Sequence, residues 1–312
     1  MQTIGLVFPG QGSQTLGMLA DIAEKYPEVV STYSQASDVL GYDLWKLVQE
    51  GPIEQLNETI HTQPALLAGS VAIWEILKKQ DKIVPALFAG HSLGEYSALV
   101  CAEALAFQDA IKLVAARGFY MQEAIPLGEG ALAAIVGLSD ATVTEICEAV
   151  RMGEVLAPVN FNSPGQVVIG GHTQAIKRAL ILAKEKGVKI AKLLPVSVPS
   201  HCILMKPAAE KIREVLATLP VKSPRIPVIN NVDVIIYEDA TSIREGLVRQ
   251  LYQPVRWVET IQKFKNHGIN YIIECGPGKV LTRLNKRIIA DSQFSHTADL
   301  DNLTSVLHQG VF

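Results

Sequence analysis

A serine flanked by glycines lies between an apolar stretch and a helical pattern, and this arrangement constrains the fold most strongly. The segment Gly90-His91-Ser92-Leu93-Gly94 matches the pattern G-x-S-x-G. Residues 83–89 before it are apolar enough for a strand buried on both faces of a parallel sheet, and residues 95–104 after it follow a helical pattern. A sharp turn between such a strand and helix exposes the serine hydroxyl beside a helix N-terminus. We therefore predict an α/β fold in which Ser92 is a nucleophile.

Strand and helix patterns alternate in the first and last thirds of the chain, which is typical of a parallel sheet covered by helices. Strand patterns lie at 3–8, 83–89, 226–232 and 271–274. Helix patterns lie at 27–48, 63–79, 95–104, 107–124, 205–219, 242–252 and 279–289. We expect these segments to form one large α/β domain from residues 1–128 and 196–312.

The middle of the chain has a different rhythm. Its strand and helix patterns follow the order β-α-β-β-α-β, at 131–137, 140–151, 155–161, 167–171, 173–186 and 188–196. This order is typical of ferredoxin-like units. We therefore predict a small ferredoxin-like domain, residues 129–195, inserted into the large one.

The composition excludes several classes of protein. Of 312 residues, 48% are hydrophobic and 19% are charged, which suits a globular core, and the net charge of −3 offers no general attraction to nucleic acid. No apolar run is long enough to span a bilayer, and the first residues lack the features of a signal peptide. The four cysteines form no CxxC pair, so neither a disulfide framework nor a zinc site is predicted. We expect a cytoplasmic protein that binds neither nucleic acid nor membrane.

A serine nucleophile needs a base within hydrogen-bond reach. Among seven histidines, His201 follows the last strand pattern of the predicted small domain, where the chain re-enters the large one. Loops between domains commonly face a cleft, but position alone leaves a catalytic and a structural role for His201 equally open. His91 adjoins Ser92, and consecutive residues of a tight turn point in different directions. We therefore expect His91 to pack or to hydrogen-bond beneath the turn.

A hydrolase triad would also need an acid between the serine and the histidine. The candidates all fall on predicted helical or surface stretches: Asp140, Glu145, Glu148, Glu154 and Glu185. None stands out, which favours a dyad in which another group orients the histidine.

An arginine occupies the apolar stripe of the helix predicted at 107–124. The stripe consists of Ala110, Leu113, Val114, Arg117 and Met121, at spacings of three or four. A buried guanidinium without a negative partner is very costly. The sequence leaves three solutions open for Arg117: an internal carboxylate, a stem that extends to water, and a substrate carboxylate held in bidentate fashion.

Further motifs follow one another along nearly the whole chain. They are FPGQGSQ (8–14), TQPALL (62–67), GHSLGEYSALV (90–100), Arg117, PVNFNSPGQVVIGG (158–171), PVSVPSH (195–201), INNVD (229–233), VRQLYQPV (248–255) and ECGPGKVL (274–281). In these motifs the chain closely resembles the bacterial malonyl-CoA:acyl carrier protein transacylases of fatty acid synthesis. The resemblance implies a hydrolase-like large domain with a ferredoxin-like insert.

The resemblance also implies roles for individual residues. Ser92 would be the nucleophile and His201 the base, oriented by the main-chain carbonyl of Gln250. The backbone N–H groups of Gln11 and Leu93 would form the oxyanion hole. Arg117 would hold the substrate carboxylate, and Gln63 would line the cleft or simply begin a helix.

The implied activity moves a malonyl group from malonyl-CoA to the thiol of acyl carrier protein through a malonyl-serine intermediate, without a metal or redox cofactor. We expect a monomer. Three alternatives stay open: a serine hydrolase or thioesterase, a catalytically silent docking domain of a larger synthase, and a transacylase for methylmalonyl or longer diacid groups.

Four lysines cluster near the end of the predicted small domain: Lys184, Lys186, Lys189 and Lys192. Because carrier proteins are usually acidic, these residues are candidates for a docking patch. An ordinary solvated face explains them equally well.

Overall fold

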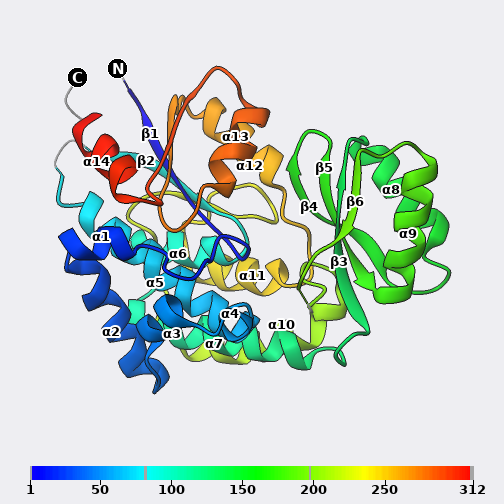
Figure 1. Ribbon diagram of the computed structural model, residues 1–312, viewed down its shortest axis with the longest axis horizontal. Coiled ribbons are helices and arrows are strands. Elements are labelled where there is room, and N and C mark those ends of the chain that lie inside the picture. The colour runs from blue at the N-terminus through cyan, green and yellow to red at the C-terminus, as the bar shows by residue number, and fades with distance from the viewer. Residues whose placement is uncertain (1, 81–82, 197, 310–312) are drawn as a thin grey trace.

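The computed structural model describes residues 2–80, 83–196 and 198–309. It contains a five-stranded sheet surrounded by helices and, on one side of the molecule, a four-stranded sheet with two helices (Figure 1). The predicted α/β fold class, with a parallel sheet and a separate small unit, is confirmed.

The five-stranded sheet is parallel throughout and has the order β7-β2-β1-β8-β9. Its strands are β1 Ile4–Phe8, β2 Pro85–Gly90, β7 Val228–Ile229, β8 Tyr271–Glu274 and β9 Gln293–His296. Because the strands are parallel, their carboxyl ends meet at one edge, and Phe8 pairs with Gly90 there. The loop that contains Gln11 and the turn that contains Ser92 therefore leave the sheet side by side.

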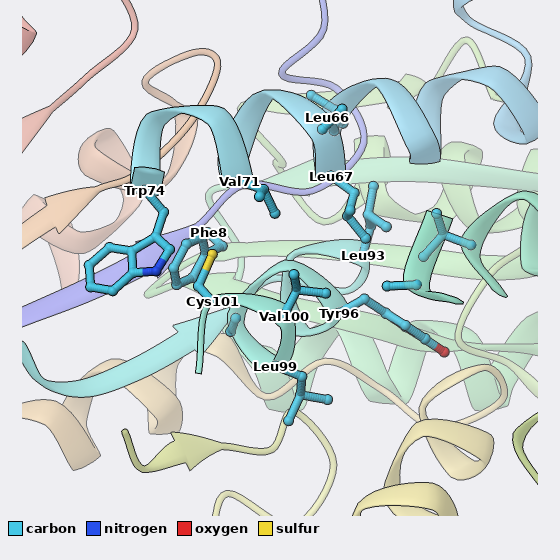
Figure 2. Packing of buried hydrophobic residues seen from close by; sticks show 14 of the residues in the cluster. Phe8, Leu66, Leu67, Val71, Trp74, Leu93, Tyr96, Leu99, Val100 and Cys101 are labelled. Carbon is cyan, nitrogen blue, oxygen red and sulfur yellow. The ribbon is translucent and has the colours of Figure 1, made fainter. Parts of the chain in front are cut away.

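Alternate residues of the central strands enter two different cores. Leu6, Phe8 and Phe88 pack into the larger core, which Figure 2 shows with side chains from β1, α5 and α6. Val7 and Leu87 face the opposite side and pack against α12 and α13. Burial on both faces explains why these strands are continuously apolar.

The helices of this part are α1 Ala20–Lys25, α2 Glu28–Leu40, α3 Leu44–Glu50, α4 Ile53–Leu56, α5 Thr59–Leu77, α6 Leu93–Cys101, α7 Phe107–Glu123, α10 Lys206–Thr218, α11 Ala240–Gln250, α12 Trp257–Asn266, α13 Val280–Ile288 and α14 Leu300–Gln309, with a 3-10 turn at Ile203–Met205. Within the described ranges, none of the helices combines the length and the apolar character needed to cross a bilayer.

The four-stranded sheet has the order β4-β5-β3-β6 and is antiparallel. Its elements are β3 Gly130–Val136, α8 Asp140–Val150, β4 Leu156–Ser163, β5 Gln166–His172, α9 Thr173–Glu185 and β6 Ile190–Leu193. The predicted β-α-β-β-α-β order is confirmed. The domain limits at 128/129 and 195/196 stay a prediction, and residues 1, 81–82, 197 and 310–312 of the predicted large domain lie outside the described residues.

Several predicted elements differ in the structure. A single helix over 27–48 is wrong, because Gly41 ends α2 with φ 77° and the Asp43 side chain caps α3. The helix expected from residue 63 begins at Thr59, where its first turn packs so closely on α7 that a Cβ at Gly118 would lie 2.6 Å from Ile60 Cα. The strand expected at 226–232 contains only Val228–Ile229. Elements α1, α4, α12, β9 and α14 were not predicted.

Candidate active site

The turn at Ser92 has a backbone conformation that side chains rarely adopt. Ser92 has φ 53° and ψ −109°, a strain of about 1–3 kcal/mol for a residue other than glycine. A Cβ at Gly90 would lie 1.8 Å from the carbonyl carbon of Gly94, and a Cβ at Gly94 would lie 2.0 Å from the oxygen of Phe8. The two glycines of the motif are therefore required for α6 to begin this close to β2 and to the end of β1.

His201 reaches the hydroxyl of Ser92 from the loop before α10. Its Nε2 lies 2.8 Å from Ser92 Oγ, and its Nδ1 lies 2.7 Å from the main-chain oxygen of Gln250. A carbonyl only accepts hydrogen bonds, so Nδ1 carries the proton and the lone pair of Nε2 faces the serine. Burial, followed by the nearby charge of Arg117, lowers the pKa of His201 to about 3. The imidazole is therefore neutral, as a base must be.

Arg117 is 2% exposed and holds its charge among neutral acceptors. Its Nη1 donates to Gln63 Oε1 at 2.8 Å, and its Nη2 donates to Gln250 Oε1 at 3.1 Å and to Ser92 Oγ at 3.3 Å. The guanidinium carbon also lies 5.3 Å from the ring centre of Tyr96. Among the described residues, no carboxylate forms an ion pair with it within 4.0 Å. Of the three solutions for Arg117, a direct internal carboxylate and an extended stem are therefore excluded.

Glu95 is a buried acid that sequence reasoning missed. It lies in α6, three residues after Ser92, and burial raises its pKa to about 7. Its carboxyl accepts from Gln250 Nε2 at 2.8 Å, so the Gln250 amide stands between Glu95 and Arg117. An acid within the otherwise apolar segment 93–101 is the same kind of signal that identified Arg117, and it could have been used.

A cavity lies between the two sheets, with Ser92, His201 and Arg117 on its wall. The loop after β1 contributes Gln11 and Gly12, the start of α6 contributes Leu93, and the small unit contributes Leu132, Asn160 and Leu194.

Gln11 and Leu93 both line this cavity, as a pair of oxyanion donors requires. Leu93 is the first residue of α6, so its N–H has no partner within the helix. The loop of Gln11 packs on the turn so closely that a Cβ at Gly10 would lie 2.4 Å from the oxygen of His91. Gln11 and Leu93 therefore line the same cavity as Ser92.

Gln63 does not line the cleft, contrary to the expectation from the family resemblance. It is 1% exposed and is not among the residues that line the cavity. Its side chain lies behind Arg117 and also contacts Met121 Sδ, at 3.7 Å. Gln63 therefore supports the arginine from within the core.

Residues around the site join the two sheets. His91 Nε2 lies 2.8 Å from Asn162 Oδ1 of β4, which agrees with the expectation that His91 hydrogen-bonds beside the turn.

Lys184, Lys186, Lys189 and Lys192 are exposed at the end of α9 and on β6. Within the ranges that the structure describes, no group of three histidine, cysteine, aspartate or glutamate residues could hold a metal ion.

Comparison with known proteins gives consistent matches over almost the whole chain. The family model described as "Acyl transferase domain" matches residues 6–302. The malonyl CoA-acyl carrier protein transacylase of Haemophilus influenzae is 55% identical over 307 residues, which cover 98% of each chain. The solved transacylase of the same name from Coxiella burnetii has a TM-score of 0.97 and 50% identity, and covers 100% of this chain and 98% of that one. A malonyl-transacylase solved in complex with a type II polyketide synthase acyl-carrier protein has a TM-score of 0.97 and 52% identity, covering 99% and 100%.

Proposed function

The chain belongs to the acyl transferase domain family, and from this premise we infer that it is a malonyl-CoA:acyl carrier protein transacylase of fatty acid or polyketide synthesis. The resemblance drawn from the sequence motifs is thereby confirmed. The enzyme moves a malonyl group from coenzyme A to the thiol of an acyl carrier protein.

One observation supports a malonyl group in particular. A buried base and a buried guanidinium converge on a single hydroxyl, since His201 Nε2 and Arg117 Nη2 lie 2.8 Å and 3.3 Å from Ser92 Oγ. An acyl group that is attacked by this hydroxyl must therefore carry an anion only a short distance from its own carbonyl carbon. A malonyl thioester, with one methylene between carbonyl and carboxylate, has that shape.

The first half of the proposed reaction forms an ester. His201 Nε2 takes the proton of Ser92, and Oγ attacks the thioester carbonyl while Arg117 holds the malonyl carboxylate. The oxyanion accepts hydrogen bonds from the N–H groups of Gln11 and Leu93. The C–S bond then breaks, and the departing sulfur takes the proton from His201, which leaves malonyl-Ser92 and coenzyme A.

The second half reverses these steps with a different thiol. The phosphopantetheine thiol of the carrier gives its proton to His201 and attacks the ester carbonyl. The C–O bond breaks, and Ser92 Oγ recovers the proton. These steps use only groups of the protein and its two substrates, so we propose that no metal or redox cofactor takes part. We also propose that the enzyme is a cytoplasmic monomer.

We also propose that the four exposed lysines guide the carrier. Lys192 lies on β6, two residues before Leu194 of the cavity wall, so a positive patch there would border the entrance for a phosphopantetheine arm. Reversal of these charges should slow transfer to the carrier and leave loading from malonyl-CoA unchanged. Equal transfer rates would remove the docking role.

The experiment that tests the function is an intact-mass measurement. Purified protein is mixed with malonyl-CoA without the carrier, beside a Ser92→Ala control. We expect wild type alone to gain one malonyl group, and carrier protein to discharge it. An unmodified protein with accumulating free coenzyme A would favour a hydrolase, and loading by methylmalonyl-CoA at an equal rate would favour a broader diacid substrate class.

A further inference from the structure

The loop that follows β7 contacts both sides of the turn at Ser92. Asn231 Oδ1 accepts from the main-chain N–H of Ser92 at 2.7 Å, and Asn231 Nδ2 donates to the main-chain oxygen of Gly90 at 2.6 Å. The Asn231 side chain is fully buried. The strands β2 and β7 pair up to Ala89↔Ile229, so this carboxamide continues the hydrogen bonding where β2 leaves the sheet.

A buried carboxyl group holds Asn231 in this place. Glu95 Oε2 accepts from the main-chain N–H of Asn231 at 3.0 Å, and Glu95 Oε1 accepts from Asn230 Nδ2 at 2.7 Å. Glu95 is 3% exposed and lies in the first turn of the helix that begins at the nucleophile. The loop and the turn are therefore tied together by both their main chains and their side chains.

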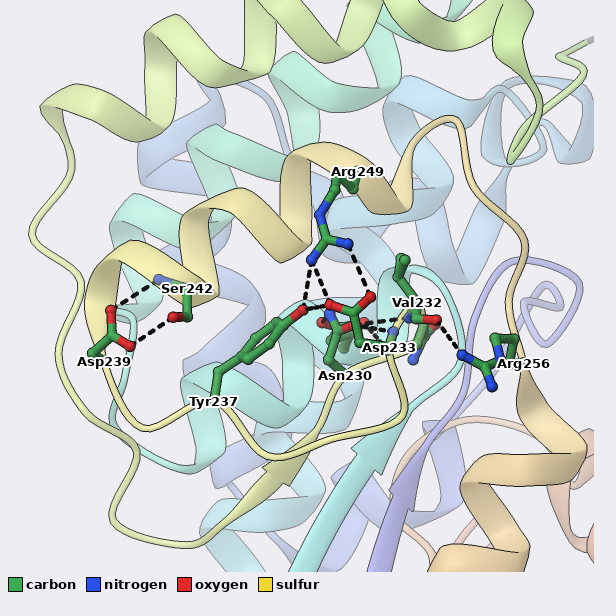
Figure 3. A network of polar contacts seen from close by, with 10 residues as sticks. Asn230, Val232, Asp233, Tyr237, Asp239, Ser242, Arg249 and Arg256 are labelled. Atoms are coloured by element: carbon green, nitrogen blue, oxygen red, sulfur yellow. Dashed lines mark hydrogen bonds and ion pairs between the residues drawn. The ribbon is translucent and has the colours of Figure 1, made fainter.

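An ion pair farther from the site fixes the rest of the loop. Asn230 Oδ1 accepts from the N–H groups of Val232 and Asp233 at 2.8 Å and 3.0 Å. Asp233 binds Arg249 of α11 in bidentate fashion, with 2.9 Å between Oδ1 and Nη1 (Figure 3). Arg249 immediately precedes Gln250, whose carbonyl orients His201. The same contacts thus set the loop of Asn231 relative to the base.

We propose that Asn231 is a positioning residue of the acyl transfer, whose carboxamide holds the main chain of Ser92 so that Oγ stays within reach of His201. The inference rests on the proposed function for the identity of the acyl group. Without the carboxamide, the N–H of Ser92 and the oxygen of Gly90 lose their polar partner, and the strained turn relaxes. Arg117 is not touched, so binding of the malonyl carboxylate is retained.

The first test replaces Asn231 by leucine, which is similar in size but cannot form these bonds. Modification of Ser92 is followed by intact mass with two reagents, malonyl-CoA and phenylmethanesulfonyl fluoride, a neutral reagent that does not need Arg117. We expect both rates to fall by about 100-fold, the usual consequence of a misplacement near 1 Å, with little change in KM for malonyl-CoA.

Thr297→Val is the matched control. Thr297 is also fully buried, and its Oγ1 likewise bridges two main-chain groups at the end of a strand, donating to Glu274 O and accepting from Gly276 N at 3.0 Å each. A general loss of packing would affect both variants. We expect the control to lose stability but to keep the rate of Ser92 modification.

The second test, Asn231→Asp, keeps the size and remains informative if the leucine variant does not fold. A protonated carboxyl can donate to the oxygen of Gly90 as the amide does, whereas an ionised one faces it with a second acceptor. The charged groups around this loop are Glu95 of α6, Arg249 of α11 and Arg256 before α12. We expect the rate of sulfonylation, relative to wild type, to rise as the pH falls.

The outcomes separate the two proposals. Wild type that reacts with the sulfonyl fluoride but not with malonyl-CoA would refute the proposed acyl group and leave the role of Asn231 testable. A folded leucine variant with wild-type rates, or a pH-independent ratio for the aspartate variant, would overturn the role of Asn231 even if malonyl loading succeeds.

Discussion

Arg117 and Gln250, both buried, are joined by a hydrogen bond of 3.1 Å from the guanidinium Nη2 to the side-chain Oε1. The other end of the same carboxamide donates to Glu95 at 2.8 Å. A neutral group thus separates a buried positive charge from a buried acid. The guanidinium is stabilised by acceptors without being neutralised, and its charge stays available for a substrate carboxylate.

Gln250→Glu should therefore weaken substrate binding. The new carboxylate would pair directly with Arg117 and compete with the malonyl carboxylate, while the main-chain oxygen that orients His201 is retained. We expect KM for malonyl-CoA to rise by about tenfold or more, with a smaller effect on sulfonylation of Ser92. Steady-state kinetics measure this, with Gln35→Glu, the same change on an exposed surface, as control. An unchanged KM would show that Gln250 does not keep the arginine free.

Arg117→Ala should weaken malonyl transfer and relax selectivity. Loss of the buried cation removes the proposed partner of the substrate carboxylate, so kcat/KM for malonyl-CoA should fall by about 100-fold or more. Acetyl-CoA should gain relative to malonyl-CoA, because it no longer leaves a buried guanidinium unpaired. The control is Arg178→Ala, which removes an ion pair with Glu154 at 2.6 Å in the small unit. Normal use of malonyl-CoA together with continued refusal of acetyl-CoA would contradict this role.

Glu274→Gln should cost stability without changing the chemistry. The Glu274 carboxyl, at the end of β8, accepts from the N–H groups of Leu281 and Thr282 at 3.1 Å and 2.7 Å, at the start of α13. A glutamine offers one acceptor oxygen in place of two, which leaves a buried donor unpaired. We expect the free energy of unfolding to fall by about 1–3 kcal/mol in denaturant titrations. A variant as stable as wild type would show that the helix start does not depend on this residue.

The local turn at Ser92 could be predicted because its glycines, the strand and the helix are adjacent in the sequence. The small sheet could be predicted because its helices and strands differ in period. Arg117 was recognisable as buried because a charge interrupted a helical stripe. In each case the residues that form the sequence pattern lie within about one helix or strand of the structural feature that the pattern predicts.

The contacts of Asn231 and Glu95 could not be predicted in the same way. Asn231 accepts a hydrogen bond from the N–H of Ser92, which lies 139 residues away in the chain, and nothing local in the sequence indicates that pairing. The family resemblance implied that Gln63 lines the cleft or begins a helix, whereas tertiary packing puts it behind Arg117. Such pairings depend on how distant elements meet, which periodicity does not encode.

The pH dependence of Ser92 reactivity should report the environment of His201. Burial and the charge of Arg117 lower its pKa from 6.5 to about 3, so the neutral base should persist well below pH 6.5. We expect sulfonylation by phenylmethanesulfonyl fluoride to decline only in strongly acidic buffer. The Arg117→Ala variant lacks the nearby positive charge, so the pKa of His201 should rise and the loss of sulfonylation should begin at higher pH. The Arg178→Ala variant should lose sulfonylation over the same pH range as wild type.

The same shift has a consequence for stability, with a definite sign. Between pH 6.5 and about 3 the unfolded chain binds a proton at His201 that the folded chain does not bind. The contribution of His201 is therefore fully present above pH 6.5 and is lost as the pH falls toward 3. Denaturant titrations across this window should give a steeper loss of unfolding free energy for wild type than for His201→Gln, which cannot titrate. Parallel curves for the two proteins would mean that the imidazole is not held neutral in the folded state.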